Sequence, residues 1–200
     1  MEGWTEQEPD GDLRRWRGPH RSVLSLGVID PEGWLSVPDS QLRELPRKLA
    51  SAQEGGLIEA FSLSRGKVSA ARLIYKRLQM PAYVYTGMFI TRPRSDCLVW
   101  TIVDGECGTT GVREAVVTAE LFGAGKLKSI QDYEYFWAQD PYDKTFRGVD
   151  HSVLRFMSDS QEYDSRFPDH PLSRVRRFLD DLCVWIQAES DTSTQSGTVN

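Results

Sequence analysis

The fold is decided by residues 83–122, YVYTGMFITRPRSDCLVWTIVDGECGTTGVREAVVTAELF, which contain three apolar runs separated by polar, turn-rich connectors. Aromatic and aliphatic residues alternate from Tyr83 to Ile90 and again from Leu98 to Val103. A period of two residues is typical of β-strands. The third run, Glu114–Phe122, puts small apolar residues on one side and mixed residues on the other. This stretch therefore predicts three consecutive strands of a meander.

Outward from this centre, the same alternation predicts more strands, and a helical period predicts two helices. The further strands are expected at Ser22–Ile29, Trp34–Val37, Leu57–Leu63 and Val68–Leu78, and the helices at Leu127–Ala138 and Leu172–Gln187. These elements predict an α+β fold, in which a single antiparallel sheet of about six or seven strands, with the meander at its core, is covered by helices that include a C-terminal helix.

The chain is expected to form one domain with a flexible segment at each end. Residues 1–21 are first acidic and then basic without any periodicity, which predicts a mobile leader. Residues 22–187 are expected to form the single globular domain. Residues 188–200 are polar and rich in serine and threonine, which predicts a disordered tail.

Composition makes several classes of function less probable. The formal net charge of −5 argues against a nucleic-acid partner, because phosphate binding needs a basic surface. The chain has no run of 18 apolar residues and no hydrophobic stretch near Met1, so we expect neither a membrane association nor a signal peptide, and a cytoplasmic location. Its three cysteines form no CxxC pair, which argues against a disulfide framework and a zinc site.

No motif commits the chain to one chemistry. The loop Gly105–Gly111, GECGTTG, lacks the spacing of a phosphate-binding loop and is expected to be a structural hairpin loop. Of the three histidines, His20 lies in the leader, and His151 and His170 follow aspartates in an acidic region without a nucleophile motif. The acidic residues between 132 and 169 fit no calcium loop and are expected to be solvated. We therefore expect no catalytic residues, no metal and no cofactor.

Two hypotheses for function remain. The first is a non-enzymatic protein-binding or accessory module, similar in role to a chaperone, an immunity protein or an adaptor, with a protein partner. Interfaces favour Trp, Tyr and Arg, and the candidate surface anchors are Trp137, Tyr142, Arg147, Arg174 and Arg177. The alternative is a small enzyme or small-ligand-binding domain with a pocket between sheet and helices. Its candidate lining residues are Tyr83, Trp100, Arg113 and Glu114.

The expected order of elements and the segment GTTGVREAVVTAEL, residues 108–121, resemble those of the PsbP-like α/β/α sandwich proteins. The resemblance covers residues 22–187 as architecture, and the segment at 140–170 departs from it. It implies a binding or accessory role and carries over no site residues. Because a fold does not determine a function, the resemblance adds only a modest argument for the first hypothesis.

Overall fold

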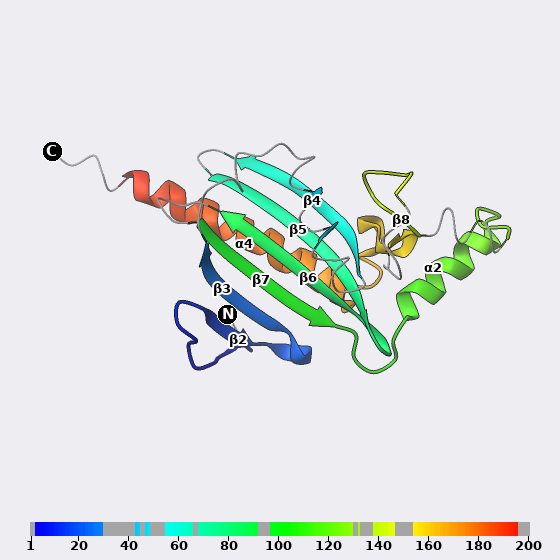
Figure 1. Cartoon of the computed structure of the whole chain (residues 1–200), viewed down its shortest axis with the longest axis horizontal. Coiled ribbons are helices and arrows are strands. Elements are labelled where there is room, and N and C mark those ends of the chain that lie inside the picture. Colours follow the sequence, from blue (N-terminus) through cyan, green and yellow to red (C-terminus); the bar gives the residue numbers. More distant parts are fainter. Residues whose placement is uncertain are drawn as a thin grey trace.

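The computed structural model describes residues 3–29, 43–44, 47–48, 55–65, 68–91, 97–129, 132, 138–146 and 154–195. Within these residues the main element is a seven-stranded antiparallel sheet with the order β1-β2-β3-β7-β6-β5-β4 (Figure 1). The strands are β1 (Thr5–Glu6), β2 (Arg14–Arg17), β3 (Val23–Ile29), β4 (Gly55–Arg65), β5 (Val68–Gln79), β6 (Ala82–Thr91) and β7 (Cys97–Gly105). The predicted fold class, α+β with one antiparallel sheet and a C-terminal helix, is confirmed.

The first two strands of the predicted meander are also confirmed. Strands β6 and β7 pair in antiparallel register with Phe89 opposite Trp100, and β5 pairs with the other side of β6. Tyr85, Phe89 and Ile90 are buried on these central strands. The alternation of large apolar residues thus corresponds to a sheet that is covered on both faces.

The third strand of the predicted meander is wrong, because Val112–Gly123 forms the helix α2. Arg113, Val117 and Leu121 are buried at intervals of four residues, which is one face of a helix. Val117 and Leu121 satisfy a period of two as well as a period of four, so the short run was ambiguous. Gly111, with a φ of 71°, precedes the helix and turns the chain out of the sheet.

The predicted leader is wrong for the described residues 3–21, because β1 and β2 extend the sheet beyond β3. Trp16 on β2 is only 8 % exposed and packs in the main core. Trp4 packs against the same core, with its ring 6.1 Å from that of Phe178. These indoles account for the order of a segment whose composition is polar.

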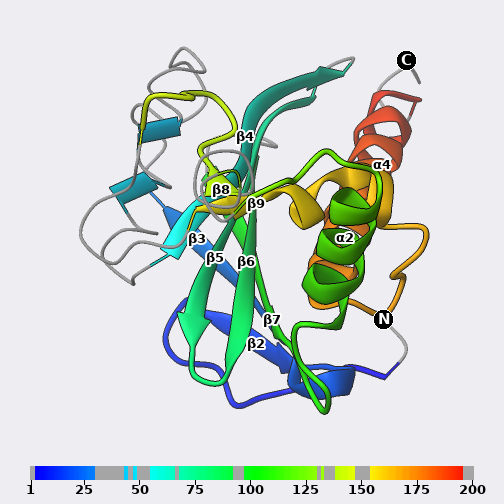
Figure 2. The ribbon, with the colours of Figure 1, turned by 90° about the vertical axis from the view of Figure 1, so that its right-hand side faces the viewer.

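The C-terminal helix α4 (Pro171–Gln195) crosses one face of the sheet, and α2 lies on the same side (Figures 1 and 2). Helix α4 continues through the first part of the predicted tail, so the prediction of disorder is wrong for residues 188–195. The apolar stripe of α4 is buried and consists of Leu172, Val175, Leu179, Leu182 and Ile186. This stripe packs on Tyr85, Phe89 and Ile102 of the central strands.

A shorter region connects α2 to α4. It contains the strands β8 (Ala138–Gln139) and β9 (Arg155–Phe156), which pair with each other, and the 3-10 helices η3 (Met157–Asp159) and η4 (Gln161–Tyr163). A further 3-10 helix, η1, spans Pro19–Arg21. Most of the predicted helix Leu127–Ala138 lies outside the described residues, as does the predicted strand Trp34–Val37, and Ala138 itself belongs to β8. No helix in the described part of the chain is long and apolar enough to span a membrane.

Candidate functional site

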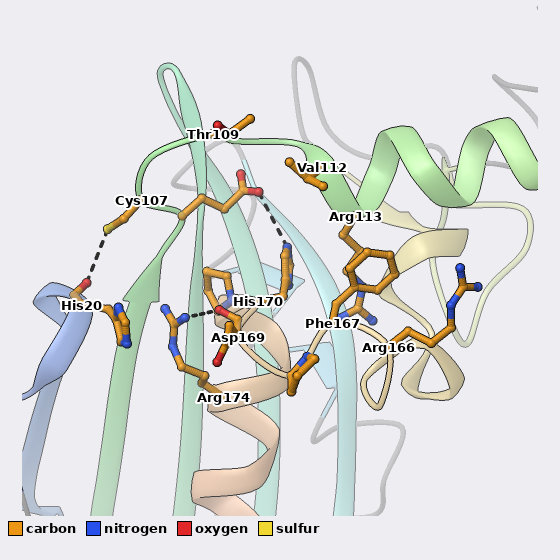
Figure 3. Close-up of a pocket in the computed structure, with 13 residues that line it drawn as sticks. His20, Cys107, Thr109, Val112, Arg113, Arg166, Phe167, Asp169, His170 and Arg174 are labelled. Carbon is orange, nitrogen blue, oxygen red and sulfur yellow. Dashed lines mark hydrogen bonds and ion pairs between the residues drawn. The ribbon is translucent and has the colours of Figure 1, made fainter.

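A cleft of about 420 Å³ lies where the β7–α2 connection, the start of α2 and the segment before α4 meet (Figure 3). The connection supplies Glu106, Cys107 and Thr109, and α2 supplies Val112 and Arg113. The opposite wall is formed by residues 166–171 and Arg174. Segments distant in sequence thus form one concave surface with several charged and polar groups on it, and a concave surface with convergent polar groups is the usual form of a ligand site.

His170 occupies this wall directly before α4. Its Nδ1 accepts a hydrogen bond of 3.3 Å from the backbone N–H of Leu172, as the side chain of an N-cap residue does. Such a cap contributes about 1 kcal/mol. It also selects the neutral tautomer that carries the ring hydrogen on Nε2. The side chain is 7 % exposed, its ring packs edge-on against Tyr85, and Nε2 has no hydrogen-bond partner among the described residues.

Two glutamates face His170 Nε2. The Oε1 atom of Glu106 lies 3.7 Å from it, and the Oε1 atom of Glu114 lies 3.9 Å from it. These distances exceed those of a hydrogen bond. The two carboxylates therefore lie close to the imidazole without a hydrogen bond to it, and Figure 3 shows the His170 side chain at the cleft.

The two carboxyl groups have different environments. Glu106 accepts backbone N–H groups from Gly111 at 2.9 Å and from Tyr83 at 3.2 Å. Although burial raises the pKa of Glu106, His170 and these N–H groups lower it below its usual value overall. Both oxygens of Glu114 lack a hydrogen-bond partner among the described residues, and burial raises its pKa.

A buried ion pair lies close enough to the cluster for Asp159 to influence Glu114 electrostatically. Lys76 and Asp159 are fully buried and in contact at 2.5 Å, and Lys76 Nζ lies 3.2 Å from the ring centroid of Phe156. Burial lowers the pKa of Lys76. Burial also raises the pKa of Asp159, but Lys76 and the N–H of Phe156 outweigh this and lower it overall.

Arg113 ties the start of α2 to the segment that leads to His170. Its guanidinium donates to the Ser158 and Ser160 carbonyls, and also to Asp164 and Ser173. A charged side chain with four partners is held in one orientation. The position of its neighbour Glu114 is fixed as a result.

Three of the four predicted pocket residues lie around this cluster. Arg113 lines the cleft, Glu114 is one of the facing carboxylates, and the backbone of Tyr83 holds Glu106. Trp100 lies elsewhere, between the rings of Trp16 and Trp185.

Three of the five predicted surface anchors lie among the described residues. Trp137 and Arg147 lie outside the described residues. Tyr142 accepts the N–H of Ala60 through its hydroxyl group, and the Arg174 side chain binds Asp104 at 2.7 and 2.8 Å on the cleft wall. Arg177 is exposed on α4.

Sequence reasoning missed Glu106 and His170. Glu106 lies in the loop expected to be purely structural, and His170 lies in the region expected to be a solvated acidic loop. One signal was available for His170, because the residue before a Pro at the first helical position is where an N-cap is expected. No sequence pattern indicated that Glu106 would lie beside it.

No protein-family model matches the chain, and no curated protein matches it.

Proposed function

We propose that the cleft is the binding site of a small polar ligand and that the protein is a small ligand-binding domain or enzyme. The observation that carries this proposal is the cluster beside the cleft, where His170 Nε2 and both Glu114 oxygens are buried without hydrogen-bond partners in the described part of the chain. Buried polar atoms are nearly always paired, so unpaired ones indicate a missing partner. Unpaired buried groups beside a concave surface are expected in a site prepared for a ligand.

The chemistry of the cluster favours proton exchange with that ligand. Glu106 has a lowered pKa and Glu114 a raised pKa, and two carboxyl groups whose pKa values are shifted in opposite directions are typical of acid–base sites. His170 directs its Nε2 toward both of them. A ligand with a hydroxyl or amine group is the kind that meets these three polar groups.

A blocking variant tests the proposal. Val112 lines the cleft and is 45 % exposed, so Val112→Trp is expected to fill the cleft without disturbing the core. Val116, one turn further along α2, does not line the cleft, and Val116→Trp is the matched control. Amino acids, carboxylic acids, sugars and nucleosides are screened by thermal shift and ligand-observed NMR. A ligand that binds wild type and Val116→Trp but not Val112→Trp supports the proposal, and a panel without any binder contradicts it.

A second candidate function is that of a protein-binding module, and the outward face of α2 supports it. Val112, Val116 and Phe122 on this face are 45 %, 36 % and 44 % exposed, and the alanines between them are exposed as well. Apolar residues at this spacing are typical of helices that dock into a groove. The resemblance to PsbP-like proteins, which stays a prediction, points to the same class.

The two candidates separate in one experiment. A tagged chain is used to capture partners from its host, beside Phe122→Ser on the outward face of α2 and Glu114→Gln in the cluster beside the cleft. A stoichiometric protein partner that is lost in Phe122→Ser but retained in Glu114→Gln favours the protein-binding module. Cytoplasmic location and the absence of a nucleic-acid partner belong to both proposals. The lack of a disulfide at Cys97, Cys107 and Cys183 and the net charge of −5 support them.

A further inference from the structure

Three potential ligand groups converge beside the cleft. One carboxylate oxygen each from Glu106 and Glu114 and one ring nitrogen of His170 all lie within 4.8 Å of one another. Glu106 and His170 also line the cleft. Three protein ligands with an open side toward a cleft are the arrangement of a catalytic metal site.

The balance of buried charge points the same way. Asp159 is paired with Lys76, and Asp164 with Arg113. Among the described residues, by contrast, Glu106 and Glu114 form no ion pair with a Lys or Arg side chain, and each faces the imidazole of His170. Buried carboxylates need a cation or a proton as a partner.

A second observation is independent of the carboxylates. The His170 side chain is more than nine-tenths buried, and its unpartnered Nε2 points at both of them. An imidazole with two carboxylates suits divalent transition-metal ions such as Zn²⁺, Co²⁺ and Mn²⁺, whereas Ca²⁺ and Mg²⁺ prefer oxygen ligands alone. We propose that Glu106, Glu114 and His170 bind one divalent transition-metal ion, with an open coordination position toward the cleft.

Binding at Nε2 has a cost at the start of α4. The ring hydrogen must move to Nδ1, and the contact with the Leu172 N–H is lost. At 3.3 Å this contact is long, and an N-cap contributes far less free energy than a set of metal–ligand bonds. The ion is therefore expected to displace the cap contact.

The test uses the full chain, freed of metal by a chelator. It is titrated with Zn²⁺ and Mn²⁺ by calorimetry and with Co²⁺ by visible absorption. The expected result is one ion per chain and a Co²⁺ spectrum of nitrogen and oxygen ligands. The metal site rests on the proposed function only in one respect, namely that a small ligand would occupy the open coordination position. These titrations contain no such ligand, so they test the metal site alone.

Matched variants locate the ion. His170→Asn keeps a capping side chain but removes the imidazole, and Glu114→Gln removes one carboxylate at nearly constant shape. Each is expected to weaken binding at least about tenfold, because even the loss of an outer partner has that effect. Asp169→Asn removes the same charge from the cleft wall outside the cluster, and it is expected to leave the affinity unchanged.

Two results would overturn the inference: wild type without saturable binding at one ion per chain, or His170→Asn and Glu114→Gln that bind as tightly as wild type. Circular dichroism shows whether each metal-free variant is folded. If one of the two variants does not fold, the metal affinity of the folded variant decides the test. The small-molecule panel is repeated with metal-free and Zn²⁺-loaded protein. An ion bound by the cluster without any binder in the panel upholds the metal site and contradicts the proposed function.

Discussion

The close packing of α4 on the sheet predicts that Gly87→Ala destabilises the protein. A Cβ atom at Gly87 would lie 2.5 Å from Val175 Cγ1, 3.0 Å from Leu179 Cδ1 and 3.1 Å from Ile102 Cγ2. These three side chains are buried in the main core, so none can turn toward solvent. The helix must move away from β6 or the side chains must leave their preferred rotamers.

Two opposing effects set the magnitude of this change. Overpacking a core by one methyl group costs about 1–3 kcal/mol. Replacing a strand glycine by alanine returns about 0.5–1 kcal/mol, because the unfolded chain has less conformational entropy. The net loss is therefore about 0–2.5 kcal/mol, which lowers the Tm by up to roughly 10 °C for a chain of this length.

Urea and thermal unfolding of Gly87→Ala measure this loss, with Gly27→Ala in β3 as the control. A Cβ atom at Gly27 meets only Leu13 Cδ1, at an ordinary distance of 3.5 Å. This control should be as stable as wild type or slightly more stable. Equal unfolding free energies for the two variants would refute the close contact between α4 and the centre of the sheet.

Three further predictions follow from buried charge and backbone geometry. Lys76→Met should lose about 3–5 kcal/mol of unfolding free energy, because Asp159 is left buried and unpaired. In urea unfolding, the double variant with Asp159→Asn should recover part of this loss. A double variant no more stable than Lys76→Met would contradict this reasoning. Because Asp159 has a lowered pKa, the stability that it contributes is present above the usual aspartate pKa and is lost as pH falls below about 4. The unfolding free energy of Asp159→Asn should therefore fall less steeply in acid than that of wild type. An equally steep fall would contradict the lowered pKa of Asp159. Gly111→Ala should cost about 1–2 kcal/mol, since φ is +71° and the Cβ has open space, whereas Gly123→Ala, where φ is not positive, should not destabilise the protein in thermal unfolding.

The sheet and α4 could be predicted because their signals are long and regular. The strands at 57–63 and 68–78 and the apolar stripe of α4 each repeat their pattern over several residues. α2 could not be distinguished from a strand, since Val117 and Leu121 fit both periods and β-branched valines favour a strand. The order of residues 3–21 could not be predicted either, because it depends on the docking of Trp4 and Trp16 on distant core residues.

Only part of the candidate site could be predicted from the sequence. Arg113 and Glu114 were recognisable as candidate pocket residues. The partners of Glu114 come from positions 106 and 170, however, and no motif joins residues at such separations. Metal-ligand spacings are recognisable only when the ligands share one loop or helix. The expectation of no metal rested on the absence of such spacing, and the metal proposal now stands against it.

The correction of α2 from strand to helix is also what allows the cluster to form. On a strand, adjacent side chains point to opposite faces, so Arg113 and Glu114 would be separated by the sheet. On a helix they are about 100° apart. Arg113 can therefore reach Asp164 and Ser173 while Glu114 faces His170. Among the described residues, Arg113 forms no hydrogen bond with the His170 ring or the Glu114 carboxylate. A substitution that weakens the Arg113 hydrogen bonds should nevertheless displace Glu114 from His170, because Arg113 holds the start of α2 in place.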